Sequence, residues 1–197
     1  MISLSHNFLF IHLPKTGGNS IQNILKEYCD DKIVPYAKNR HLLNRFGVNN
    51  LTYNTHKHSV LKRYNNCLKS EVYHSLYKFS IIRNPWDRVV SFYFSPHRKR
   101  TYFNKKEFKS VIKNTPLLRK AICLNNSCKL DKHIDFLLRF EQLNRDFKTL
   151  CKEIGITFYT LPRVNTSKHE HYSHYYDQST YNMVKNRFKE EIDFGEY

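Results

Sequence analysis

The segment that most constrains the fold is the run from Phe8 to Ser20, FLFIHLPKTGGNS. Its opening residues, Phe8 to Ile11, are apolar without a break, which is typical of a strand buried on both faces of a parallel sheet. Pro14 ends this strand, and a pair of glycines then precedes an apolar pattern of helical period. Backbone N–H groups and the helix dipole favour negative charge at such a turn. The segment therefore predicts a phosphate-binding loop.

The side chains of this loop also suit an anion. Lys15 supplies a mobile cation, while Thr16 and Ser20 supply hydroxyl donors. The order of residues differs from the kinase and ATPase loop, G-x-x-x-x-G-K-[ST], because Lys15 here precedes the glycines. An ordinary strand-to-helix turn is the plain alternative, and a second motif downstream argues against it.

Composition favours one globular domain, residues 1–197, with an anionic partner. Hydrophobic residues make up 40% of the chain, which excludes a disordered protein, and the length is typical of a single domain. The net charge of +16 suits a nucleotide, an acidic glycan, a nucleic acid or an acidic membrane surface, and charge alone does not choose among them.

Five scattered cysteines without a C-x-x-C pattern indicate free thiols in a reducing compartment. No secretory signal or membrane span is recognised, so we expect a cytoplasmic protein. Its oligomeric state is not predicted.

The second informative segment is IIRNPWDRVVS, residues 81–91. The run Tyr77–Ile82 predicts a strand. Asn84 followed by Pro85 predicts the start of a helix, and Asp87 is placed to reach back to the cap.

Arg83 is thereby expected at the carboxyl end of a strand, where open α/β sheets bind ligands. Ser91 follows two turns into the helix, and a guanidinium with a hydroxyl suits a terminal phosphate monoester. In the plain alternative, Arg83 pairs with a carboxylate and Ser91 is a surface hydroxyl.

Together the two segments resemble the P-loop sulfotransferases that use 3′-phosphoadenosine 5′-phosphosulfate (PAPS), especially the carbohydrate 2-O-sulfotransferase-like branch and its small bacterial relatives. The stretches FLLRFEQL at 136–143 and LPRVNTS at 161–167 are also similar to that family. The resemblance implies a three-layer α/β fold with a central, mostly parallel sheet flanked by helices. It implies that the 5′-phosphosulfate is bound by Lys15, Thr16, Gly17, Gly18, Asn19 and Ser20, and the 3′-phosphate by Arg83 and Ser91. Asn19 departs from the Thr usual in the family, although an amide also donates to phosphate. A late basic loop in relatives implies a further 3′-phosphate contact from Arg163 or Lys168.

Sulfuryl transfer needs a cation on the departing phosphate and a base on the acceptor hydroxyl. The sulfuryl group carries less charge than a γ-phosphoryl group, so no metal is expected. Lys15 fits the first role. We favour His58 as the base, since relatives carry a Lys-His pair here and Lys57 would hold its pKa down. His56 is the second candidate, His12 is expected to orient the loop, and a structural histidine is the plain alternative.

The predicted activity is transfer of a sulfuryl group from PAPS to a hydroxyl of a carbohydrate or glycolipid, with no nucleic acid as partner. Two alternatives stay open: a P-loop nucleotide-dependent phosphotransferase (kinase), and a non-catalytic basic domain that binds polyanions. The basic run at 97–106 fits a solvated loop or, alternatively, a rim that binds an anionic acceptor. The sequence does not identify the acceptor.

The remaining pattern predicts a loop-rich insertion at 30–55, with weak strand character near Leu51–Tyr53. Arg139 and Glu141 are candidates for a structural ion pair. A strand is expected at 136–140, and helices are expected at 20–29, from about 60 to 65, and at 69–76, 105–113, 116–124, 141–154 and 179–189.

Overall fold

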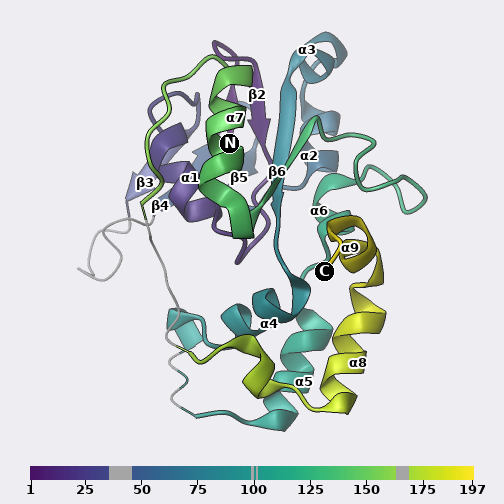
Figure 1. The fold of residues 1–197 in the computed structure, drawn as a ribbon. Helices are drawn as coiled ribbons and strands as arrows, with labels where there is room; N and C mark the ends of the chain where they lie inside the picture. The colour runs from purple at the N-terminus through teal and green to yellow at the C-terminus, as the bar shows by residue number, and fades with distance from the viewer. Residues whose placement is uncertain (36–45, 99, 101, 163–168) are drawn as a thin grey trace.

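The computed structural model describes residues 1–35, 46–98, 100, 102–162 and 169–197. Its central sheet has the strand order β1-β2-β6-β7, in which β2, β6 and β7 are parallel and β1 is antiparallel at the edge (Figure 1). The predicted mixed α/β fold with a mostly parallel sheet is confirmed. The four strands are β1 (Ile2–Ser3), β2 (Phe8–Phe10), β6 (Tyr77–Ile82) and β7 (Phe136–Arg139).

The sheet is buried on both faces, as the unbroken apolar run of β2 predicts. Phe8 and Phe10 pack into one core with helices α1 (Gly18–Leu25) and α7 (Leu143–Glu153). Leu9 lies in the core on the opposite face, because successive residues of a strand point to opposite sides. That second core is closed by helices α2 (Leu61–Cys67), α3 (Ser70–Ser75) and α6 (Leu118–Ile122). The result is the predicted three-layer arrangement.

A third apolar core joins three helices beyond the carboxyl ends of the strands, where β6 leads into α4 (Figure 1). Trp86, Phe108 and Val184 are buried there, one from each helix. The helices are α4 (Pro85–Tyr93), α5 (Lys105–Asn114) and α8 (Gln178–Arg187), with the short 3₁₀ helices η2 (Pro96–Arg98) and η4 (Tyr172–Tyr175) beside them.

The structure corrects the prediction for the insertion at 30–55. Its described residues include an antiparallel sheet of β3 (Lys32–Pro35), β4 (Phe46–Asn50) and β5 (Thr55–His56), and residues 51–53 form a turn instead of a strand. These strands are short and interrupted by Pro, Gly and Asn, so they depend on their pairing with each other, which local sequence does not reveal. Residues 36–45 of the insertion lie outside the described residues.

Several element boundaries also differ from the predictions, since the helix expected at 20–29 spans Gly18–Leu25 and the helix expected at 116–124 spans Leu118–Ile122. The strand expected to reach Phe140 ends at Arg139, and the 3₁₀ helix η3 (Phe140–Gln142) precedes α7. The expected last helix is followed by a separate helix, α9 (Lys189–Gly195). All five cysteines are free thiols, as predicted. Among the described residues, no helix is long and apolar enough to cross a membrane.

A buried ion pair fastens α4 to α9. The Arg88 guanidinium lies 3.1 Å from the Glu191 carboxylate, and the two side chains are 0% and 3% exposed. Arg88 also donates to the Pro116 carbonyl at 2.6 Å, and Glu191 accepts the Leu118 N–H at 2.8 Å. Because α4 begins two residues after Arg83, this pair anchors the helix that follows Arg83.

We predict that Arg88→Met lowers the free energy of unfolding by about 3 to 5 kcal/mol, because it leaves the Glu191 charge buried without a partner. Urea unfolding followed by circular dichroism measures this difference. Arg119→Ala is the control, since its partner Glu190 is 41% exposed and water replaces the lost contact. Equal losses in the two variants would contradict the prediction.

Candidate functional site

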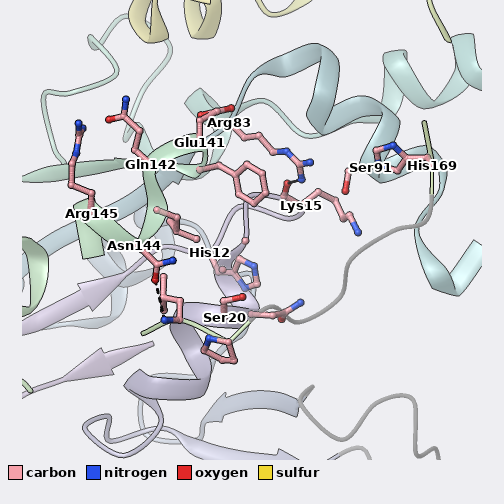
Figure 2. Close-up of a pocket in the computed structure, with 17 residues that line it drawn as sticks. His12, Lys15, Ser20, Arg83, Ser91, Glu141, Gln142, Asn144, Arg145 and His169 are labelled. Atoms are coloured by element: carbon pink, nitrogen blue, oxygen red, sulfur yellow. Dashed lines mark hydrogen bonds between the residues drawn. The ribbon is translucent and has the colours of Figure 1, made fainter. Parts of the chain in front are cut away.

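A cavity of about 750 Å³ opens where the three parallel strands end (Figure 2). Its wall combines the loop after β2, the start and second turn of α4, and the segment after β7. The predicted residues that line it are Lys15, Gly17, Gly18, Asn19, Ser20, Arg83 and Ser91. Arg163 and Lys168 lie outside the described residues.

The loop after β2 is held in a sharply turned conformation. Lys15 and Gly17 have positive φ angles of 68° and 83°, a region that costs a non-glycine residue about 1 to 3 kcal/mol. A Cβ atom on Gly17 would lie 2.9 Å from the side chains of Phe140 and Leu143. The Thr16 hydroxyl donates to the Leu13 carbonyl at 2.8 Å and is buried, so it stabilises the loop and does not line the cavity.

Arg83 connects this loop to α4. Its Nη1 donates to the Lys15 carbonyl at 2.8 Å, its Nε donates to Asp87 at 2.9 Å, and its guanidinium lies 3.9 Å from the Phe140 ring centre. The carboxylate pairing considered as the alternative thus exists, and Arg83 still lines the cavity with Ser91 (Figure 2). The two predicted segments therefore meet in one cavity.

The start of α4 differs in one respect from the prediction. Asn84 is the N-cap, accepting the N–H groups of Trp86 and Asp87 at 3.0 and 3.3 Å. However, Asp87 pairs with Arg83, and the Asn84 N–H donates to Glu141 at 2.7 Å. Glu141 is 57 residues away in sequence, so no local pattern signals this contact.

The expected ion pair between Arg139 and Glu141 is not formed. Arg139 donates to the Gly195 carbonyl at 2.5 Å, whereas Glu141 accepts the Asn84 N–H and the Tyr197 hydroxyl. Arg139 thus contacts the end of α9, and Glu141 links the N-cap of α4 to Tyr197.

A second cavity, of about 310 Å³, adjoins the first at this loop. It shares His12, Lys15 and Asn19 with the first cavity and is also lined by Lys57 and His58. His56 lines neither cavity; its ring nitrogen lies 3.2 Å from the Ser59 hydroxyl. The geometry therefore separates the two candidate bases and brings only His58 to the loop.

The orientation of His58 is set by a backbone carbonyl. Its Nδ1 lies 3.1 Å from the His12 carbonyl oxygen, which only accepts hydrogen bonds, so Nδ1 carries the proton in the neutral ring. The lone pair is then on Nε2. Burial lowers the pKa of His58, and the Lys57 charge lowers it further, while the hydrogen bond to His12 acts in the opposite direction. The predicted direction is correct, but burial contributes more than Lys57.

His12 separates the two cavities. Its ring is buried and lies 4.7 Å from the His58 ring, centre to centre. A Cβ atom on Gly18 would lie 2.4 Å from His12 Cδ2, so this glycine allows the ring to pack against the loop. Burial and the neighbouring His58 and Lys57 lower the pKa of His12 well below 6.5. His12 is therefore neutral at pH 7.

Lys57 connects the loop to the antiparallel sheet of β3, β4 and β5 through two hydrogen bonds. Its ammonium donates to Asn19 Oδ1 at 2.6 Å and to the Phe46 carbonyl at 3.1 Å. Because the amide oxygen of Asn19 is engaged, its N–H₂ group is the part that can donate to a ligand. The loop from Lys15 to Ser20 can therefore bind an anion next to His58, which can act as a base when its ring is neutral.

Sequence reasoning missed the wall of the first cavity formed after β7. Phe140 and Leu143 line it with Leu161 and Pro162, and the polar side chains there are Glu141, Gln142, Asn144, Arg145 and His169. The signals were the FLLRFEQL stretch and the start of LPRVNTS, and no binding part was assigned to the residues of either stretch that line this wall. Within the described part of the chain, no three His, Cys, Asp or Glu side chains are grouped to hold a metal ion.

A family model described as "Sulfotransferase family" matches residues 1–194, which is nearly the whole chain. Searches of curated proteins and of solved structures found no match.

We predict that the His58 ring titrates with a midpoint below 6.5, because burial disfavours the charged form. An NMR pH titration of the imidazole resonances measures the midpoint. Lys57→Gln should raise it by removing a nearby positive charge, whereas Lys62→Gln, an exposed lysine on α2, should leave it unchanged. A midpoint at or above 6.5 would count against this account of the site.

Proposed function

The chain belongs to the sulfotransferase family, and we propose that it transfers a sulfuryl group from PAPS to a hydroxyl of a saccharide or glycolipid. The observation that carries the proposal is the meeting of two cavities at His12, Lys15 and Asn19. A donor and an acceptor in adjoining cavities would react across this shared wall. The larger cavity, about 750 Å³, is within the roughly 300 to 1,000 Å³ usual for cofactor sites.

The first cavity fits the donor in its chemistry. We assign the 5′-phosphosulfate to the loop from Lys15 to Ser20, where Gly17 and Gly18 line the cavity at the start of α1 and Lys15 adds positive charge. The 3′-phosphate is assigned to Arg83 and Ser91, a guanidinium and a hydroxyl that line the same cavity. The adenine would pack on the apolar wall of Phe140, Leu143, Leu161 and Pro162. When bound, PAPS supplies an activated sulfuryl group.

The residues of the chain then perform two tasks. The Lys15 ammonium stabilises the negative charge that develops on the departing phosphate. His58 accepts the proton of the acceptor hydroxyl at Nε2, since Nδ1 is held by the His12 carbonyl. The imidazolium formed keeps that hydrogen bond, which stabilises its positive charge.

We predict that adenosine 3′,5′-bisphosphate binds in isothermal titration calorimetry without magnesium and more tightly than ATP. Ser91→Ala should weaken this binding about tenfold, as expected for one hydrogen bond to a charged group. Ser179→Ala, an exposed serine on α8, is the control and should bind as the native protein does. Preference for ATP with magnesium would support a phosphotransferase and refute the proposal.

We predict that His58→Gln lowers kcat about 10²- to 10⁴-fold, the usual contribution of a general base. Transfer of ³⁵S from labelled PAPS to a mixed saccharide pool measures the rate. His56→Gln should retain activity, because His56 lines neither cavity. In the native enzyme the rate should fall as the pH decreases through the lowered pKa of His58, since the base is then protonated. Equal losses in the two variants would exclude His58 as the base.

A further inference from the structure

We infer that the outer surface of α5 and the residues just before it bind an anionic lipid bilayer. This surface, called the α5 surface below, consists of two aromatic and three cationic side chains: Tyr102, Phe103, Lys106, Lys109 and Lys113. The inference goes beyond the proposed function, because none of these side chains lines either cavity of the site.

Two adjacent aromatic side chains are exposed just before α5 begins. Tyr102 is 69% exposed and Phe103 is 38% exposed. Removing such large rings from water is favourable, so a neighbouring pair in this position indicates a surface that a partner covers. Aromatic rings, tyrosine above all, suit the boundary between lipid head groups and acyl chains, because the ring is apolar and the hydroxyl remains hydrated.

The backbone that carries these rings is held by a buried side chain. The hydroxyl of Tyr93, which is 0% exposed, donates to the Tyr102 carbonyl at 3.4 Å and accepts the Asn104 N–H at 2.7 Å. Asn104 in turn caps α5, since its side chain accepts the Glu107 N–H at 3.0 Å. Because the backbone is already fixed, binding through these rings costs less conformational freedom than binding through an unsupported loop would.

The three lysines form the outer face of α5. Lys106, Lys109 and Lys113 are spaced as i, i+3 and i+7, so they share one face of the helix. The opposite face of α5 is buried in the third apolar core. The helix is therefore attached by its apolar side and presents its cationic side outward, beside the exposed rings.

These lysines differ from the cations next to them. Arg100 pairs with Glu107, and Lys105 pairs with Asp177. Among the described residues, no carboxylate is paired with any of the three lysines of the α5 surface. Their charge is thus available to an anionic partner, and an anionic bilayer strengthens binding by about fivefold for each such lysine.

The shape of the α5 surface favours a bilayer over other anionic partners. The start of α5 lies at the end of the molecule remote from the central sheet (Figure 1). A nucleic-acid strand binds along a groove that follows its backbone, whereas a flat bilayer is contacted by a protruding end. A second copy of this chain would bring like charges together, since the net charge is +16.

The first test uses the full chain with vesicles of phosphatidylcholine, with and without phosphatidylserine, and measures binding by cosedimentation. We expect binding to the anionic vesicles and not to the neutral ones. A variant that lacks the three charges of the α5 surface should bind the anionic vesicles about 100-fold more weakly, since each lysine contributes about fivefold. Its substitutions are Lys106→Gln, Lys109→Gln and Lys113→Gln.

The matched control removes the same charge from exposed lysines of α2 and α7. It should bind the anionic vesicles nearly as the native protein does, because these lysines lie on other elements. Its substitutions are Lys62→Gln, Lys148→Gln and Lys152→Gln.

The second test asks whether the exposed rings contact lipid. The chain has one tryptophan, Trp86, which is 4% exposed, so a tryptophan introduced at the surface gives a separate signal. On anionic vesicles, Tyr102→Trp should shift its emission to shorter wavelength and be quenched by brominated phospholipid. Tyr159→Trp is the control and should show neither effect, since Tyr159 is 57% exposed but belongs to the segment after α7.

Equal losses in the two lysine variants would show that net charge alone drives binding and would overturn the inference. It is also overturned by no binding to anionic vesicles, by no quenching at position 102, or by tighter binding to a single-stranded oligonucleotide than to the vesicles. None of these measurements involves PAPS, so each outcome leaves the proposed function to its own test with the bisphosphate.

Discussion

The packing of His12 against Gly18 is the contact on which the site depends. The ring occupies space that any side chain at position 18 would fill, and it forms part of the wall of both main cavities. The carbonyl of the same residue holds Nδ1 of His58. One residue at the end of a buried strand therefore fixes the loop and the histidine beside it. A change at position 18 would displace both at once.

The second constraint is the concentration of positive charge around this contact. Lys57 and Arg83 approach the loop from two other segments. Lys15 belongs to the loop itself and has a left-handed backbone conformation that is costly for a lysine. Carbonyl and carboxylate groups offset part of this charge: Arg83 donates to the Lys15 carbonyl and to Asp87, and Lys57 donates to the Phe46 carbonyl. The stability needed to hold such a site comes from the three apolar cores around it.

Much of the fold was predictable because its signals are local. An unbroken apolar run predicts a strand buried on two faces, and β2 has this character, whereas β6 is recognised by its aromatic and β-branched residues. Asn84 followed by Pro85 predicts a helix start, and α4 begins there. The sheet of β3, β4 and β5 was missed, since its strands are short and stabilised mainly by pairing with one another. Asp87 was predicted to accept the Asn84 N–H, and this was wrong for a similar reason, because the observed acceptor, Glu141, comes from a distant segment.

By itself, the sequence determined the strand, the glycine loop and the helix that follows it, because chain geometry and hydrophobic period act over a few neighbouring residues. It also predicted that Lys15 and Arg83 follow strands of one parallel sheet, whose carboxyl ends lie at the same edge. Only the tertiary structure decided that His58, and not His56, contacts the His12 carbonyl across 46 residues. It alone placed the exposed Tyr102 next to the buried Tyr93, whose hydroxyl donates to its carbonyl. Such contacts depend on how whole elements pack, and the local pattern of residues carries no record of that packing.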